Sequence, residues 1–430
     1  MRRVLIITYY WPPNGGAGVY RWLKFSKYLP GYGWKPVVYT PSNPELTADD
    51  PGLLRDVHPD VELVKQPISE PYTMYKRLTG RKADEKVETA FLSERKRKSW
   101  RDDLALWVRS NFFVPDARVG WVRPSVAFLK AYLKEHPVEA IITTGPPHSM
   151  HLIGLELKRA LGVKWIADFR DPWTDIDFYH QLALTGWADR RHRRRERSVL
   201  QNADRVVTVS WSWAKDLEKL GGRKVEVITN GFDPADIPAP PVPVDEAWSL
   251  VHLGAMSATR DCPALWKRLS ALCESDPEFA ARFKLRFVGP VDHSIMESVR
   301  AAGLLDKVER LGRVSHDDAM REMQRARVLL LPINDTPNKQ GILPGKLFEY
   351  LGVGRPILAV GPAGGDVVRV LGDAHLRLDR ELSGVDDARI LAFFRSSDRA
   401  VTSSVDRFSR RTLAGEVAEL LGAATTGRLT

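Results

Sequence analysis

Glycines and charged side chains follow apolar segments of this sequence at several points, where they could bind an anion. Residues 14–18, Asn-Gly-Gly-Ala-Gly, place unhindered backbone N–H groups just before a helical segment, a geometry suited to an anion. A tight turn that only needs glycine is the alternative. Residues 338–358 hold a Gly-Ile-Leu-Pro-Gly turn, then Lys346 and Glu349, at the start of an amphipathic run.

Charged and imidazole groups follow two further apolar segments. Arg170 and Asp171 come directly after residues 163–169, and burying them unpaired would carry a large penalty. We expect them to pair with each other or to meet a ligand. His148 and His151 follow the segment before, although a histidine is more often structural and helical spacing would let His151 turn into the domain.

Two other kinds of site are disfavoured. A dinucleotide fingerprint fails because Arg21 occupies the place of the third glycine, and the second predicted strand ends without an acidic residue for a ribose. Asp175 and Asp177 match a loose Asp-x-Asp metal-binding pattern, but no predicted strand comes immediately before them. We therefore expect neither NAD nor a metal ion.

The elements that position these residues alternate between apolar strands and helices. Residues 2–10 and 139–145 read as buried strands, and helical segments such as residues 151–161 lie between successive strands. The same alternation restarts near residue 248. The pattern predicts an α/β protein of two doubly wound, Rossmann-like domains, with a ligand in the cleft between them.

The expected domain boundaries follow from proline content. Residues 237–247 are rich in proline and read as a linker between an N-terminal domain, residues 1–236, and a C-terminal domain, residues 248–395. Residues 396–430 read as a helical tail that packs back on the N-terminal domain.

Composition limits the class of protein. A length of 430 residues with 43% hydrophobic and 27% charged residues is enough for two domains with sizeable cores. The two cysteines cannot form a disulfide framework, and no apolar run is long enough for a signal peptide or a membrane span. We expect a cytoplasmic protein.

The formal charge of +10 is concentrated in residues 93–103 and 189–198. A helix through residues 99–113 would put Trp100, Leu104 and Trp107 on one side, which suits an anionic membrane surface. A solvated helix face is the alternative. We expect no nucleic-acid binding, because no nucleic-acid motif accompanies the charge.

Taken together, these motifs resemble those of a known family. PPNGGAG, VITNGFD, HLGAMSATRD and GILPGKLFEYLGVGRPILAV resemble retaining glycosyltransferases of the B fold, family 4 type, over nearly the whole chain. IADFRDPW and TTGPPHSMH are similar to a subgroup associated with bacterial surface and exopolysaccharide assembly.

The resemblance implies a nucleotide-sugar site. It implies that Glu349 accepts hydrogen bonds from ribose hydroxyls and that Lys346 and the amides before it face a diphosphate. The base, of a UDP- or GDP-linked sugar, is expected at a loop read by its main chain. The full implied donor set is Gly15, Gly16, Gly254, Arg260, Arg313, Val314, Ile342, Leu343, Lys346 and Glu349.

The implied reaction moves a hexose to a hydroxyl of a lipid-linked or polysaccharide-precursor sugar, with retention at the anomeric carbon. The resemblance assigns catalytic roles to His148, Asp171, Arg260 and Lys346, and acceptor-side roles to His151 and Arg170. No metal ion or cofactor is expected, because cations in the chain would stabilise the departing diphosphate. Peripheral attachment to the inner face of the plasma membrane is also expected.

The sequence departs from the family pattern at two positions. Gly341 stands where the family has the first of two glutamates, and Ala255 stands where it has an arginine; Arg260 is the nearest replacement cation. These departures leave two other functions open. One is a nucleotide-sugar epimerase, and the other is a non-catalytic protein that binds a nucleotide-sugar.

Overall fold

The computed structural model describes residues 1–46, 49–69, 100–395 and 405–426. The described residues divide into two units. Residues 1–46, 49–69, 100–229 and 410–426 belong to unit 1, and residues 230–395 and 405–409 belong to unit 2.

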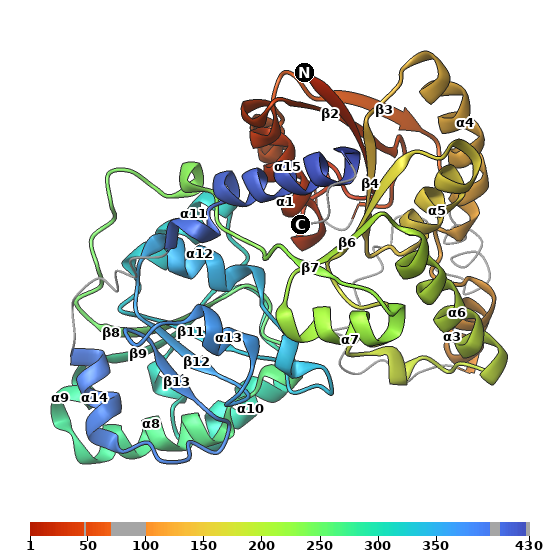
Figure 1. Cartoon of the computed structure of the whole chain (residues 1–430). Coiled ribbons are helices and arrows are strands. Elements are labelled where there is room, and N and C mark those ends of the chain that lie inside the picture. Colours follow the sequence, from red (N-terminus) through yellow and green to blue (C-terminus); the bar gives the residue numbers. More distant parts are fainter. Residues whose placement is uncertain (47–48, 70–99, 396–404, 427–430) are drawn as a thin grey trace. The chain divides into compact units, whose positions relative to one another are not determined.

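Unit 1 contains, within its described residues, a seven-stranded parallel sheet of order β3-β2-β1-β4-β5-β6-β7 (Figure 1). Its strands are β1 (Arg2–Ile7), β2 (Trp34–Pro41), β3 (Glu62–Gln66), β4 (Ala140–Gly145), β5 (Lys164–Phe169), β6 (Arg205–Thr208) and β7 (Glu226–Val227). Its helices are α1 (Ala17–Tyr28), α3 (Trp100–Phe112), α4 (Val122–Glu135), α5 (Ser149–Leu161), α6 (Gly186–Asn202), α7 (Trp211–Gly221) and α15 (Arg410–Thr426).

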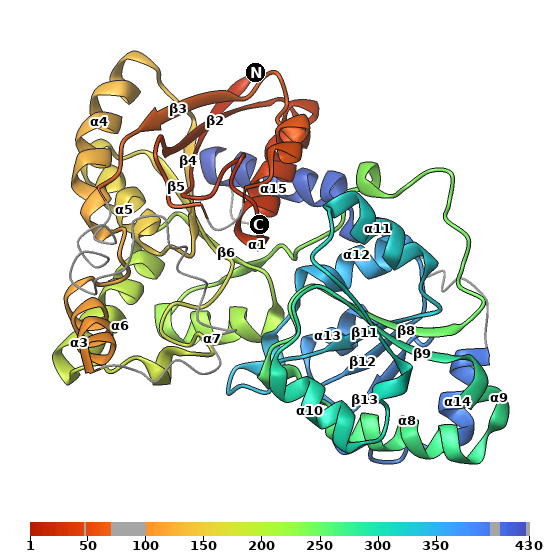
Figure 2. The same cartoon turned by 180° about the vertical axis from the view of Figure 1, so that it is seen from behind.

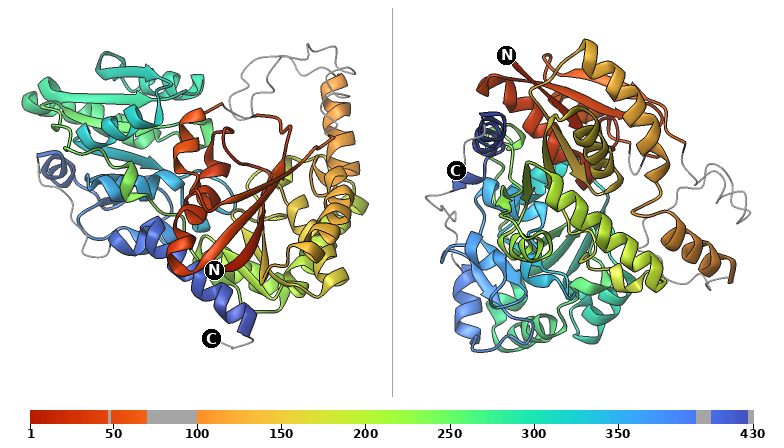
Figure 3. Two further views of the ribbon diagram at one scale, coloured as in Figure 1. Left: turned by 90° about the horizontal axis from the view of Figure 1, so that it is seen from above. Right: turned by 45° about the vertical axis from the view of Figure 1, so that its right-hand side comes forward.

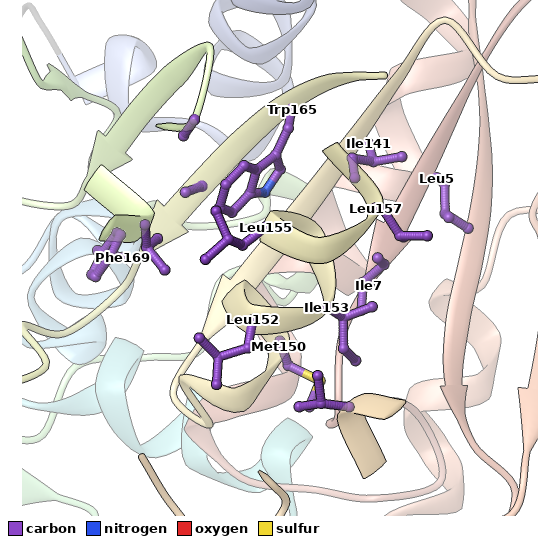
Figure 4. Packing of buried hydrophobic residues seen from close by; sticks show 14 of the residues in the cluster. Leu5, Ile7, Ile141, Met150, Leu152, Ile153, Leu155, Leu157, Trp165 and Phe169 are labelled. Carbon is purple, nitrogen blue, oxygen red and sulfur yellow. The ribbon is translucent and has the colours of Figure 1, made fainter. Parts of the chain in front are cut away.

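The central strands of this sheet are buried on both faces, which is why they read as continuous apolar runs. In β1, Leu5 and Ile7 join a cluster that includes side chains of α4 and α5, and Figure 4 shows this packing around Ile153 and Trp165. The alternate side chains of β1 face the other way and pack with α1 and α15. Helices therefore cover both faces of the sheet.

The last helix of the chain belongs to unit 1. α15 packs on α1, and the Tyr32 hydroxyl donates a hydrogen bond of 2.9 Å to the Arg411 carbonyl. Both views of Figure 3 show the blue helix α15 beside the red N-terminal elements. Leu413, Val417 and Leu421 complete one of the two hydrophobic clusters of this sheet.

Unit 2 repeats the architecture with a six-stranded parallel sheet of order β10-β9-β8-β11-β12-β13 among its described residues (Figure 2). The strands are β8 (Trp248–Leu253), β9 (Phe283–Val288), β10 (Val308–Gly312), β11 (Val328–Pro332), β12 (Ile357–Val360) and β13 (Leu376–Leu378). The helices are α8 (Pro263–Ser275), α9 (Pro277–Arg282), α10 (His293–Ala301), α11 (His316–Arg325), α12 (Gly345–Val353), α13 (Asp366–Val370) and α14 (Asp387–Arg395). Side chains of α8, α9, α10 and α14 form one core with the strands.

The predicted fold class is confirmed: each unit is a doubly wound, Rossmann-like α/β domain. In both, the strand order reverses beside the first strand, between β1 and β4 in unit 1 and between β8 and β11 in unit 2. The cleft expected between the domains stays a prediction. Among the helices that the structure describes, none combines the length and apolar character that a membrane span requires.

A buried ion pair fixes α1 to the sheet of unit 1. Arg21 and Asp168 are 2% and 0% exposed, and their closest atoms, Nη2 and Oδ1, lie 3.0 Å apart. Trp22 Nε1 and Thr144 Oγ1 donate to the same carboxylate, at 2.7 and 2.9 Å. The remaining N–H groups of Arg21 donate to the carbonyls of residues 228–229. The arginine that breaks the dinucleotide pattern is thus a structural residue whose charge is compensated.

Asp168→Asn should destabilise unit 1 by about 3–5 kcal/mol, because it leaves the charge of Arg21 buried and unpaired. Urea denaturation followed by tryptophan fluorescence measures the change. Asp216→Asn is the matched control, since Asp216 pairs with Lys219 at the surface and should cost less than about 1 kcal/mol. Equal shifts in the two variants would contradict the role given to this ion pair.

Candidate functional site

The carboxyl end of β8 brings together several of the residues that the sequence singles out. Gly254 follows β8 with φ 82°, a conformation that favours glycine. A Cβ added there would lie 3.2 Å from the Nζ atom of Lys346, which projects from the first turn of α12. The glycine therefore lets the backbone of this loop approach the lysine closely.

Lys346 is held by the end of β8. Its Nζ donates hydrogen bonds to the Leu253 carbonyl and to Nε2 of His252, the latter at 3.3 Å. Burial lowers the pKa of this lysine well below its ordinary value, and the nearby Arg260 lowers it further, whereas Glu349 opposes the shift. An ammonium in this position gains most from a ligand that brings negative charge.

His252 was missed by sequence reasoning and orients Lys346. It is 1% exposed, and its Nδ1 lies 3.2 Å from the Leu330 carbonyl on β11. Because a carbonyl can only accept, Nδ1 carries the proton and the lone pair of Nε2 faces Lys346. Burial, followed by the charge of Lys346, lowers the pKa of His252 well below its ordinary value, so the ring stays neutral.

Arg260 bridges the loops that follow β8 and β11. It ends the short helix η6 (Ala258–Arg260), where its Nε donates to Asn334 Oδ1 at 2.6 Å and its Nη1 donates to the Ala255 carbonyl at 2.7 Å. The guanidinium is therefore fixed at the reversal of strand order, close enough to Lys346 to affect its pKa. Asn334 is a second residue that sequence reasoning missed.

Glu349 lies three residues beyond Lys346 on α12, at intermediate exposure between buried Phe348 and Tyr350. Tyr350 fixes this helix to the sheet, since its hydroxyl accepts from the Leu253 N–H at 3.1 Å. The structure thus places Glu349, Lys346 and Arg260 in one group around the carboxyl end of β8.

The other residues of the implied donor set in unit 2 fall into two groups, one next to α12 and one after β10. Ile342 and Leu343 follow buried Gly341 and precede Pro344, the N-cap of α12, so they lie in the segment that leads into this helix. Arg313 and Val314 are exposed and follow β10, which β9 separates from β8. Two strand spacings of the sheet, about 10 Å, separate that loop from the Lys346 group. Its role stays a prediction.

In unit 1 the glycine-rich turn and Arg170 lie together. Gly15 and Gly16 precede α1, with Gly16 as its N-cap. Arg170, which follows β5, donates through Nη1 to the Gly18 carbonyl at 3.0 Å and through Nη2 to the Pro146 carbonyl. This arginine connects the first turn of α1 and the loop after β4 to the loop after β5.

His148 and His151 differ in what surrounds them. His151 is fully buried, hydrogen-bonds Thr143 Oγ1 through Nδ1 at 2.8 Å and stacks on Phe169, so it lies in the domain core. His148 occupies the N-cap position of α5 without a capping hydrogen bond from its side chain, and its ring stacks on Trp173 with a centroid distance of 5.2 Å. Burial lowers the pKa of His151 to about 3 and that of His148 well below its ordinary value. His148 is therefore a neutral imidazole, and its burial makes it a weak base.

Asp171 lies next to Arg170 in the same group. Burial raises the pKa of its carboxyl, and Asp177 and Asp168 add to the shift, whereas Arg170 lowers it. A carboxyl whose pKa is raised in this way is suited to accept a proton from a hydroxyl or to orient one. The catalytic roles expected for His148 and Asp171 remain predictions.

A buried network behind Asp171 was also missed from the sequence. Glu196 of α6 is 1% exposed and accepts hydrogen bonds from the backbone N–H groups of Trp173 and Thr174, at 3.1 and 3.3 Å. His192 of the same helix accepts from Trp173 Nε1 at 2.9 Å. Its pKa is lowered to about 4 by burial, so it too is neutral. These bonds fix the loop that carries Arg170 and Asp171.

Two sites of different chemistry result, one in each unit. Unit 2 presents two cations, a glycine loop and a helix start, which together suit an anion such as a diphosphate. Unit 1 presents a neutral imidazole, a carboxyl with raised pKa and a tethered arginine, which suit a hydroxyl-bearing group. Asp175 and Asp177, the Asp-x-Asp pair, follow the loop in unit 1, and the expectation that they bind no metal ion stays a prediction.

A sequence comparison finds a family match in the first half of the chain. Residues 77–236 match the model of Glycosyltransferase Family 4, and this match supports a glycosyltransferase of the family 4 type. No curated protein matches the chain significantly in sequence.

Solved structures resemble the chain over nearly its whole length. Sucrose-phosphate synthase from Thermosynechococcus elongatus has a TM-score of 0.61 at 15% identity, with all of both chains covered. A glycosyltransferase from Rickettsia africae has a TM-score of 0.60 at 12% identity, with 99% of both chains covered. Anabaena HepE, solved with UDP-glucose, has a TM-score of 0.59 at 15% identity, covering 98% of this chain and 100% of that chain. These likenesses show the glycosyltransferase B fold.

Binding of pyrophosphate to the Lys346 group should take up protons, because a nearby anion raises the lowered pKa of the ammonium. Affinity should therefore fall as pH rises from the lowered pKa of the free protein toward the higher pKa of the complex. Isothermal titration calorimetry in buffers of different ionisation enthalpy counts the protons.

Lys346→Met should abolish the uptake of protons that accompanies pyrophosphate binding, apart from any uptake by pyrophosphate itself. Lys339→Met, at a partly exposed lysine paired with Asp335, should keep it. Equal uptake by wild type and Lys346→Met would assign the protons to pyrophosphate itself and contradict the role of Lys346.

Proposed function

We propose that the chain transfers a hexose from a uridine or guanosine diphosphate sugar to an acceptor hydroxyl, with retention at the anomeric carbon. The observation that carries the proposal is the pairing of Arg260 and Lys346 at the reversal of strand order in unit 2, with Glu349 beside them. Positive charge concentrated at the start of a helix favours the binding of an anion, and the diphosphate of a sugar donor is such an anion.

Uridine is the favoured base. Anabaena HepE was solved in complex with UDP and with UDP-glucose, and a trehalose-6-phosphate structure from E. coli contains UDP-2-fluoro glucose. Glu349 would accept hydrogen bonds from the paired ribose hydroxyls, since a carboxylate is an acceptor at both oxygens. The exposed loop with Arg313 and Val314 would contact the base through its main chain.

The proposed chemistry exchanges one C–O bond for another at the anomeric carbon. The bond to the β-phosphate oxygen breaks as the acceptor oxygen bonds to the same face of the sugar, and the hydroxyl proton passes to the departing phosphate. Arg260 and Lys346 would neutralise the charge that grows on the diphosphate. This scheme calls for no metal ion, because two side-chain cations supply the positive charge.

On the acceptor side we assign unit 1. Asp171 and neutral His148 would orient the attacking hydroxyl, with Arg170 meeting an acceptor phosphate and His151 supporting His148 from the core. A lipid-linked saccharide of a surface or exopolysaccharide pathway would fit, since such acceptors carry both hydroxyls and phosphate. The enzyme would then work at the cytoplasmic face of a membrane.

A non-catalytic nucleotide-sugar-binding protein is the second candidate, and one observation favours it. Gly341 is buried at the end of the short helix η8 (Lys339–Gly341), three residues before the cap of α12, at the position where the family has its first glutamate. The absence of that carboxylate removes a contact to the transferred sugar. Arg260 and Lys346 remain in place, however, and they are the residues on which departure of the diphosphate depends.

Transfer is tested by incubating the protein with radiolabelled UDP-hexoses and GDP-hexoses, with and without a lipid extract as acceptor. We expect labelled glycolipid from an α-linked donor, with an α-linkage in the product by NMR. Release of nucleotide without any acceptor requirement would indicate hydrolysis, conversion of one UDP-hexose into another would indicate an epimerase, and binding without turnover would favour the non-catalytic protein.

Arg260→Ala should lower kcat by about 10²–10³ at saturating donor, because the removed charge acts mainly on the transition state. Arg260→Lys should recover only part of the activity, since an ammonium cannot form the two-pronged contact of a guanidinium. If Arg260→Ala kept a kcat near that of wild type and Lys346→Ala lost most of it, Lys346 alone would stabilise the departing diphosphate.

A further inference from the structure

Two helices of unit 1 expose aromatic and apolar side chains outside the site described above. α3 exposes Leu104, Trp107, Val108 and Phe112, at 51%, 39%, 37% and 61%. Trp187, in the first turn of α6, is 55% exposed. Large aromatic side chains are costly to leave in water, and their grouping on neighbouring helices marks an interaction surface.

These two helices are fixed to each other. Asn111 of α3 donates through Nδ2 to the Ala183 carbonyl at 2.8 Å and accepts at Oδ1 from the Thr185 N–H at 2.7 Å. Thr185 in turn caps α6 by accepting from the Ala188 N–H. Figures 1 and 2 both show α3 and α6 side by side. The exposed side chains of both helices therefore belong to one piece of surface.

The outer face of α6 adds positive charge. Trp187, Arg190, Arg191 and Arg194 follow the helical spacing of three, four and seven residues, which places them on one face. The Arg191 guanidinium lies 5.1 Å over the Trp187 ring. Among the described residues, no acidic side chain forms an ion pair with any of these three arginines, whereas Arg193 pairs with Asp189.

The charge on this face has little compensation. The pKa of Arg195, whose guanidinium bonds the Val114 carbonyl, is lowered by burial first and then by Arg191 and Arg194. Like charges that repel each other in this way bind a surface of opposite charge more readily than an isolated arginine does. We call the group Leu104, Trp107, Phe112, Trp187, Arg190 and Arg194 the α3–α6 surface.

We propose that the α3–α6 surface docks on an anionic lipid bilayer. Tryptophan and phenylalanine partition into the boundary between headgroups and acyl chains, while arginines beside them contact anionic headgroups. The combination distinguishes a bilayer from a nucleic acid, which would use the charge and leave the apolar side chains of α3 exposed. The basic run at residues 93–99 lies outside the described residues, and the surface consists of α3 and α6 alone.

The inner face of α6 connects this surface to the acceptor-side loop. His192 and Glu196, which point inward, hold Trp173 and Thr174, and Trp173 stacks on His148. One helix thus presents arginines to the bilayer and holds the loop with Arg170 and Asp171. This part of the inference rests on the proposed function, because it would place a lipid-linked acceptor next to the groups that receive it.

Cosedimentation of the full-length protein with phosphatidylcholine vesicles, with and without about 30 mol% of the anionic lipid phosphatidylglycerol, tests the docking. We expect binding to the anionic vesicles that weakens as salt rises. Arg190→Gln with Arg194→Gln should lower the partition coefficient about tenfold or more. Phe112→Ser with Trp187→Ser should lower it by a similar factor, including at high salt, where the apolar contribution dominates.

The matched control is Arg300→Gln with Arg321→Gln, which removes the same charge from exposed positions of unit 2. Its partition should stay within about twofold of wild type. Equal losses in the control and in the α6 variant would show a response to net charge only and overturn the proposal. Preferential binding to a duplex oligonucleotide, or no binding to anionic vesicles, would overturn it as well.

Transfer to a water-soluble acceptor separates this inference from the proposed function. The double variant Arg190→Gln with Arg194→Gln should retain that activity and the melting temperature of wild type. It should lose transfer to an acceptor embedded in anionic vesicles. Loss of vesicle binding with unchanged transfer to the embedded acceptor would contradict the link between docking and acceptor delivery. If the wild type transfers to neither acceptor, the proposed function is wrong. Membrane docking of the α3–α6 surface is then tested by vesicle binding alone.

Discussion

A parallel sheet whose strand order reverses leaves a crevice at the reversal, because the helices that follow the two flanking strands run to opposite faces. Each unit has one such reversal, between β1 and β4 and between β8 and β11. The loops that follow these four strands carry the glycine turn before α1, His148, Gly254 and Asn334. The reversal of strand order therefore determines where these residues lie in both units.

Within that constraint, unit 2 brings two basic side chains together. Arg260 donates hydrogen bonds to Asn334 and a backbone carbonyl, and Lys346 donates to His252 and another carbonyl, so these bonds orient both side chains. Burial first and Arg260 second lower the pKa of Lys346, whereas Glu349 opposes the shift. A site of this kind needs little rearrangement when negative charge develops on a leaving group, which is the physical requirement of diphosphate departure.

Much of the fold could be predicted, because strands buried on both faces read as apolar runs separated by helical segments. Arg260, Lys346 and Glu349 were identified from local motifs that follow strands. His252 and Asn334 were not, since their contacts join residues 94 and 74 positions apart and depend on the pairing of β8 with β11. Glu196 was not recognised from the sequence, because it lies in an arginine-rich run. Its spacing of four residues from His192 on α6 places both side chains on the inward face of the helix.

The central claim is that the Arg260 and Lys346 pair binds the diphosphate of a nucleotide-sugar. A crystal structure of the protein with UDP tests it most directly. The account predicts β-phosphate oxygens within hydrogen-bonding distance of the Arg260 guanidinium and Lys346 Nζ, with the ribose hydroxyls on Glu349. A diphosphate bound elsewhere, with Lys346 still directed only at His252 and the Leu253 carbonyl, would contradict it.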